Sequence, residues 1–174
     1  MRPVLLVLAL LAAPSLAQTR HNTAAPIDFG ADTIELQDRA NRAVLSGNVS
    51  VRQAGMNLNA ARMTVAYTGQ VFGGNPQVSR LDASGGVTVR RPDQTARSSY
   101  AIYDLNRRVI TMLGAVTLNQ GPNTVNGGRL TINLDTGRAV IDGSSVGSRG
   151  SGAASGTATR GGRVTGTFSV PDRR

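Results

Sequence analysis

LSGNVSVRQAGMNLNAARMTVAY, residues 45–67, is the stretch that decides the fold, because its aliphatic residues alternate with polar ones. Positions 45, 47, 49 and 51 share one face of an extended chain, and the serine, asparagine and arginine residues between them share the other. The alternation continues through Met56, Leu58 and Ala60, and then through Met63, Val65 and Tyr67. This pattern predicts consecutive β-strands rather than helices.

The same pattern recurs along the chain. At a shift of 67 residues the stretch lies over MLGAVTLNQGPNTVNGGRLTINL (112–134), and at a shift of 38 SGNVSVR (46–52) lies over SGGVTVR (84–90). Each copy predicts a hairpin that exposes an apolar face it cannot bury alone. Glycine-rich positions such as Gly55, Gly85–Gly86 and Gly127–Gly128 are interpreted as the tight reversals between strands. An all-β fold follows, with a β-sandwich, a jelly roll and a short solenoid as the open alternatives.

The two ends of the chain differ in composition from its body. Residues 1–17 combine Arg2, an apolar run too short to span a bilayer and a small-residue site, which predicts a signal peptide cut after Ala17. Residues 18–143 form the predicted β-domain, and residues 144–162 are a Gly/Ser/Arg-rich flexible linker. A last strand and tail occupy residues 163–174.

Charge and cysteine content narrow the function classes. The chain has 19 basic residues, all arginine, against ten carboxylates, for a net charge of +9. Two interpretations stay open: an anionic partner suited to arginine forks, or codon bias. There is no cysteine, so disulfides do not contribute to stability.

Catalytic and nucleic-acid chemistry are not expected. His21 is the only histidine and lies near the predicted mature terminus, so neither a catalytic nor a metal role is assigned to it. Metal binding by the carboxylates of residues 28–38 is less favoured than ordinary solvated positions. The pairs Arg90–Arg91 and Arg107–Arg108 are interpreted as solvated hairpin ends, and the aromatic residues are too scattered for single-strand binding. We therefore predict no enzyme activity, cofactor, metal or nucleic-acid partner.

Several features together resemble the OstA-like domain of the LptA family of periplasmic lipopolysaccharide transport proteins. They are the leader, the strand cores G-N-V-S-V and G-A-V-T-L, the opening PIDF at 26–29 followed by Ala31-Asp32, and the closing RVTGTFSVP at 163–171. The resemblance implies an open antiparallel β-jelly roll with V-shaped facing sheets. It also implies a periplasmic carrier that shields the acyl chains of lipid A in an apolar trough between those sheets.

On this model the candidate groove residues are inward aliphatic and aromatic side chains, each with plain core packing as its alternative. They are Ile27, Phe29, Leu45, Val49, Val51, Met56, Leu58, Met63, Val65, Met112, Val116, Leu118, Val125, Leu130 and Ile132.

The resemblance further implies partners. It predicts head-to-tail self-association and docking to LptC-like and LptD-like β-jelly-roll proteins through Ile27, Phe29, Val164, Phe168 and Val170. The linker at 144–162 is longer and looser than the family pattern, so a tethered capping strand is the alternative to rigid stacking. A second function class also remains, an edge-assembling structural or chaperone-like β-module of the periplasm without a lipid ligand.

Overall fold

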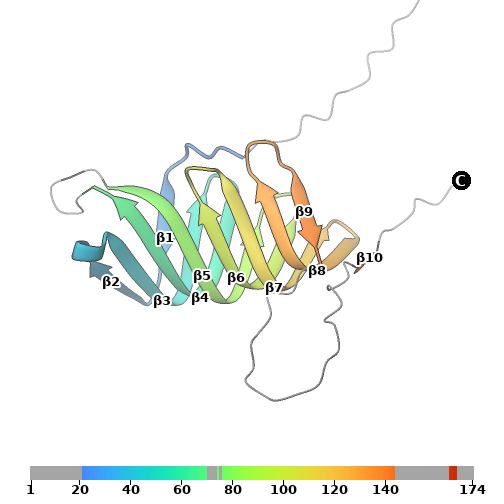
Figure 1. Cartoon of the computed structure of the whole chain (residues 1–174), viewed down its shortest axis with the longest axis horizontal. Coiled ribbons are helices and arrows are strands. Elements are labelled where there is room, and N and C mark those ends of the chain that lie inside the picture. The colour runs from blue at the N-terminus through green and yellow to red at the C-terminus, as the bar shows by residue number, and fades with distance from the viewer. Residues whose placement is uncertain (1–20, 70–73, 75, 144–164, 168–174) are drawn as a thin grey trace, which may run out of the picture.

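The fold is a meander of antiparallel strands. The computed structural model describes residues 21–69, 74, 76–143 and 165–167. In that part of the chain, one sheet has the order β1-β3-β4-β5-β6-β7-β8-β10, with β2 also paired to β3 and β9 to β8 (Figure 1). The strands are β1 (Ile27–Gly30), β2 (Thr33–Gln37), β3 (Arg42–Gln53), β4 (Met56–Thr68), β5 (Gln77–Arg90), β6 (Thr95–Asp104), β7 (Val109–Gln120), β8 (Asn123–Asn133), β9 (Ala139–Asp142) and β10 (Thr165–Thr167).

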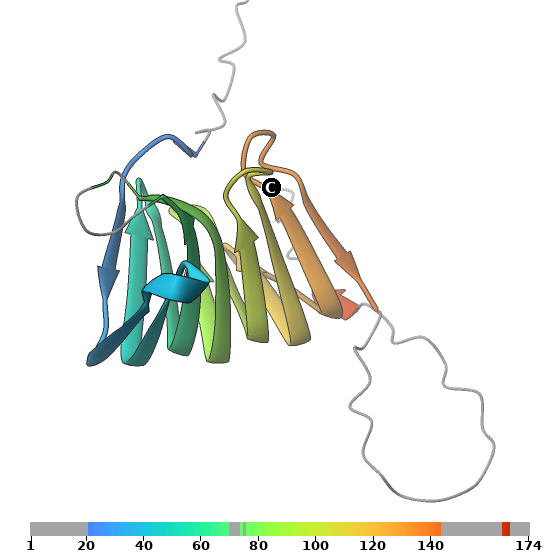
Figure 2. The same ribbon diagram turned by 60° about the vertical axis from the view of Figure 1, so that its left-hand side comes forward.

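All of the long strands, β3 to β8, bend in the middle at the same level. The register between neighbours shifts there, for example between Ser46 and Val49 on β3 and between Leu113 and Val116 on β7. Three of these strands carry two consecutive residues of positive φ at the bend: Gly47–Asn48, Gly85–Gly86 and Gly114–Ala115. Such paired left-handed residues form a β-bulge that redirects a strand without ending it. The bends together form a corner line, which Figure 2 shows along the lower edge of the sheet.

The corner divides the sheet into two walls. The first wall comprises β1, β10, the C-terminal halves of β3, β5 and β7, and the N-terminal halves of β4, β6 and β8. The second wall comprises β2, β9 and the remaining halves of the same six strands. The predicted open antiparallel β-jelly roll with facing sheets is therefore confirmed.

The inner faces of the walls form one apolar core. Alternate residues point inward on each strand half, so that Leu45 and Val49 of β3 are both buried although they lie on different walls. The core is mostly aliphatic, with Tyr67 and Tyr103 as its aromatic members. The interior is thus built from the aliphatic positions that the sequence repeat marks.

Two groups of glycines were misassigned from sequence. Gly85–Gly86 lies inside β5 at the corner, and Gly127–Gly128 lies inside β8, so neither pair forms a reversal between strands. At Gly85–Gly86 a positive φ is needed equally by a hairpin turn and by the bulge, which is why the local sequence did not separate them.

The strand predicted at the C-terminus is present in part. Thr165–Thr167 forms β10 and pairs antiparallel with β8 of the same chain. The predicted signal peptide, the linker at 144–162, and Val164, Phe168 and Val170 lie outside the described residues.

Candidate functional site

The space between the two walls is a trough, and β1 and β2 form one end of it. An apolar cavity of about 890 Å³ lies at that end. This volume falls in the range of about 300–1,000 Å³ that is usual for small-molecule sites. Its walls come from the segment before β1, from β1 and β2, from the second-wall parts of β3, β4 and β5, and from single residues at the end of β3 and just after β6. The lining residues are Thr23, Ala24, Ala25, Pro26, Ile27, Phe29, Ile34, Leu36, Ala43, Leu45, Gln53, Val65, Tyr67, Pro76, Gln77, Val78 and Leu105.

The edge strands leave large apolar side chains uncovered at this end. Phe29 is 37% exposed, Ile34 52% and Leu36 47%. Strand register places all three on the inner face, because Phe29 pairs with Val51, Ile34 with Leu45, and Leu36 with Ala43. Cross-strand partners share a face of the sheet, and those three partners are buried in the core. The apolar interior is therefore open toward solvent along β1 and β2.

The predicted groove residues divide into two groups. Ile27, Phe29, Leu45 and Val65 line the cavity. The second group lies elsewhere on the inner faces. Within this group, Val125 is half-buried opposite Leu118. The remaining ones are packed in the core with at most 8% exposure: Val49, Val51, Met56, Leu58, Met63, Met112, Val116, Leu118, Leu130 and Ile132.

Sequence reasoning did not identify several lining residues. Ile34 and Leu36 alternate with Thr33 and Glu35, and this period of two could have identified them as an inward face. Val78 and Leu105 reach the cavity only because the second wall folds over the first, which no local pattern encodes.

A buried glutamine ties the rim of the cavity together. Gln53 is 2% exposed, and its Nε2 donates to the backbone oxygens of Thr23 (3.1 Å) and Ala25 (3.0 Å). Its Oε1 accepts a hydrogen bond from the Tyr103 hydroxyl at 2.7 Å and lies 3.3 Å from Nε2 of His21. Gln53 is the last residue of β3, at the rim of the first wall, and Tyr103 lies at the rim of the second wall. The hydrogen bond between them therefore joins the two walls across the trough.

Burial governs the titration of groups at this rim. Burial raises the pKa of Tyr103 to about 12, so the phenol keeps its proton at neutral pH. Burial also lowers the pKa of His21; its contact with Gln53 opposes this shift, and the Arg91 guanidinium adds to it. The neutral phenol of Tyr103 and the amide of Gln53 thus offer hydrogen-bonding groups at this rim, and the Arg91 guanidinium lies close enough to act on His21.

Three of the carboxylates near the N-terminus accept hydrogen bonds from neighbouring side chains. Asp32 accepts a hydrogen bond from Asn48 Nδ2 at 2.9 Å, and Glu35 accepts one from Gln37 at 2.9 Å. Asp38 accepts one from the Tyr67 hydroxyl at 3.2 Å. Within the described ranges no group of acidic, histidine or cysteine side chains has the composition of a metal site.

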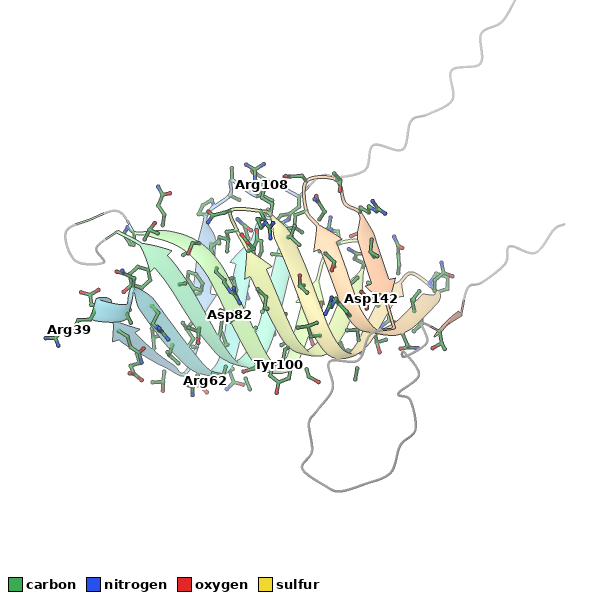
Figure 3. The ribbon with its side chains drawn as sticks, viewed as in Figure 1. Arg39, Arg62, Asp82, Tyr100, Arg108 and Asp142 are labelled. Carbon is green, nitrogen blue, oxygen red and sulfur yellow. The ribbon has the colours of Figure 1, made fainter. Side chains whose placement is uncertain are left out.

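The arginine pairs stand at hairpin ends as expected, but one member is not solvated. Arg108 forms an ion pair with Asp135 at 3.2 Å, and both side chains are about half exposed; Figure 3 shows Arg108 at the rim of the sheet opposite the corner. Arg91, by contrast, has a side chain only 7% exposed, which corrects the expectation of a solvated position.

Comparisons with known proteins agree with this architecture. Residues 29–138 match the family model described as "LptA/(LptD N-terminal domain) LPS transport protein". An uncharacterized protein of Rhizobium meliloti (strain 1021) is 34% identical over 121 residues, a match that covers 67% of this chain and 65% of the relative, just under two thirds of its length.

A solved structure supports the fold. LptH of Pseudomonas aeruginosa, described as the LptA-homologous periplasmic component of a lipopolysaccharide transport device, superposes with a TM-score of 0.68. The superposition covers 86% of this chain and 99% of LptH at 17% sequence identity, a level that shows a shared fold. No helix in the described portion of the chain is long and apolar enough to cross a membrane. Because the family model spans most of the bent sheet, the chain belongs to the LptA/(LptD N-terminal domain) family of lipopolysaccharide transport proteins.

Proposed function

We propose that this protein carries lipopolysaccharide by sheltering acyl chains of lipid A in the cavity beside β1 and β2. The observation that supports this most directly is the exposure of Phe29, Ile34 and Leu36 on the inner face of the trough. A monomer that exposes apolar side chains together at a cavity mouth presents a binding surface rather than a finished core. The lining is mainly apolar, so the proposed activity is non-covalent shielding.

The energetics of acyl chains explain why a carrier is needed. Each buried methylene contributes about 0.8 kcal/mol, so a chain of about a dozen carbons costs on the order of 10 kcal/mol in water. Contact with the cavity lining removes much of that cost. Chains that extend beyond the cavity would have to displace core contacts such as those of Val51 and Met56, which are 1% and 2% exposed.

The same proposal includes an assembly role. β1 and β2 form one end of the sheet, and β9 and β10 form the other. We propose head-to-tail stacking in which the β9–β10 end of one protomer meets the β1–β2 end of the next, with LptC-like and LptD-like proteins at the ends. Ile27 and Phe29, together with Val164, Phe168 and Val170, are the proposed edge residues. The proposed layout has a signal peptide cut after Ala17, export to the periplasm, a domain at 18–143, a linker at 144–162 and a closing strand.

Site-specific photo-crosslinking tests the carrier role. A photoreactive residue at Ile34 or Leu36 is expected to label lipopolysaccharide in cells, because both side chains face the trough. Glu35 is the matched control, since it lies between them on the same strand, is exposed, and faces outward. Equal labelling from position 35 and its two neighbours would contradict the proposal.

Depletion separates carrier from scaffold. Loss of a carrier is expected to leave lipopolysaccharide at the inner membrane, whereas loss of an edge-assembling module without a lipid ligand is not. Normal delivery of lipopolysaccharide in depleted cells would exclude the transport role.

A further inference from the structure

The two rims of the trough differ in polarity. On the first wall, several polar residues at the rim point inward. Gln53 lies opposite Met56, Arg91 follows β5, Gln94 precedes β6, and Gln120 ends β7. These positions continue the inward alternation of Val89, Ala96 and Leu118, which are buried in the core. We call Gln53, Arg91, Gln94 and Gln120 the polar lip.

On the facing rim of the second wall, the inward side chains are apolar or aromatic. Tyr67, Tyr103 and Leu134 are buried there, and Leu105 packs against the core. An amphiphile that enters between these rims meets amide and guanidinium groups on one side and mainly apolar and aromatic side chains on the other. The trough mouth is therefore itself amphipathic.

Arg91 is the charged member of the polar lip, and its charge is incompletely paired. Its side chain is 7% exposed, and its Nη1 is buried without a hydrogen-bond partner. The carboxylate of Asp93 is 3.9 Å from Nε, beyond the 2.7–2.9 Å typical of a charge-assisted hydrogen bond, and is itself 56% exposed. A guanidinium cannot lose its proton to escape burial, so an unpaired buried arginine is costly.

We propose that Arg91 is an anion-binding residue that receives a phosphate group of the lipid headgroup while acyl chains occupy the cavity; this inference rests on the proposed carrier function. Gln53 lines the cavity, and Arg91 lies two strands further along the same lip. Two strand spacings are about 10 Å, so one amphiphile can span from the cavity to Arg91. Nη1 is covered by protein, so binding requires a local rearrangement of the lip.

The test compares two lipid A probes with matched variants. Wild-type protein, Arg91→Gln and Arg97→Gln are titrated with hexa-acyl lipid A carrying both phosphates and with the same lipid after removal of its phosphates. Arg97 is exposed on the outer face of the first wall, so its substitution removes the same charge away from the lip. Arg91→Gln is expected to weaken binding of phosphorylated lipid A about tenfold and to leave binding of the dephosphorylated lipid unchanged. Arg97→Gln is expected to match wild type with both lipids.

Other outcomes overturn the assignment in distinguishable ways. Wild-type affinity of Arg91→Gln for phosphorylated lipid A, or an equal loss for both lipids, removes the headgroup role and leaves the carrier function standing. Failure of the wild-type protein to retain either lipid removes the carrier function itself. Inorganic phosphate is tested separately. If it raises the melting temperature of wild type but not of Arg91→Gln, and leaves lipid A binding unaffected, the site is assigned to free phosphate instead.

A second variant covers a folding defect in Arg91→Gln, which thermal unfolding monitored by circular dichroism would reveal. Arg91→Lys keeps the charge but loses the two-pronged fork, and is expected to show a smaller loss for phosphorylated lipid A alone. Unchanged binding of both lipids by a folded Arg91→Lys and Arg91→Gln would reject the proposal.

Discussion

Gln53 is the residue at which the apolar interior changes into a hydrogen-bonded rim. A buried amide is tolerated when its donors and acceptor have partners, and both ends of this side chain do. Its partners come from the segment before β1 and from Tyr103 of the opposite wall, so one side chain joins three parts of the molecule. The coincidence of Gln53 with Gln120 in the sequence repeat identifies the position, but its partners depend on how the walls face each other.

Tyr103 gives this rim a stability that depends on pH. Its pKa is raised by burial to about 12, whereas the unfolded chain titrates near the ordinary value of 10. Between these values the folded protein holds one more proton than the unfolded chain, so stability falls as pH rises. Tyr103→Phe removes this titration, and the gap in melting temperature between wild type and variant is expected to narrow by several degrees from pH 9 to pH 12. A gap that stays constant over this window would show that Tyr103 ionises equally in both states.

The corner of β5 offers a matched pair of glycines for testing the bend as a structural element. Gly85 (φ 82°) and Gly86 (φ 70°) both have left-handed backbones, so alanine at either position costs about 1–2 kcal/mol. A Cβ at position 85 would lie 2.7 Å from Cβ of Ala61 on β4, whereas a Cβ at position 86 meets nothing within 4 Å. Gly85→Ala is therefore expected to lose about 1–3 kcal/mol more than Gly86→Ala in denaturant unfolding. Equal losses would mean that β4 and β5 do not pack closely at the corner.

The strands could be predicted from the sequence because apolar residues occur at every second position, as at Met63 and Val65. The corner could not be predicted, because the pair Gly85–Gly86 suits a hairpin turn and a β-bulge equally well. The cavity was predicted only in part. Phe29 and Leu45 follow from local alternation, whereas the approach of Leu105 depends on how the second wall folds over the first. Nor does the local sequence show that Arg91, in a hairpin end, turns inward and becomes buried.

At the scale of the whole molecule, the trough is open along β1 and β2. Among the described residues, the large apolar side chains that face inward and remain exposed are Phe29, Ile34 and Leu36, all on β1 and β2. At the opposite end, Ile141 of β9 packs against the core. Under the stacking proposal, the β9–β10 end of one protomer covers the apolar side chains that stay exposed at the β1–β2 end of the next.

Removal of residues 144–174 tests that arrangement, because the deletion takes away β10 and the proposed edge residues Val164, Phe168 and Val170. The buried core lies between Ala43 and Leu134, so the truncated protein is expected to fold with a melting temperature within a few degrees of the full chain. Its mass by analytical ultracentrifugation should stay that of a monomer at concentrations where the full chain assembles. Arg97→Gln, on the outer face of the first wall in the middle of the sheet, should assemble like wild type. Assembly of the truncated chain at the same concentration as the full chain would show that protomers meet elsewhere, and the stacking proposal would then fail while the cavity at β1 and β2 kept its assigned role.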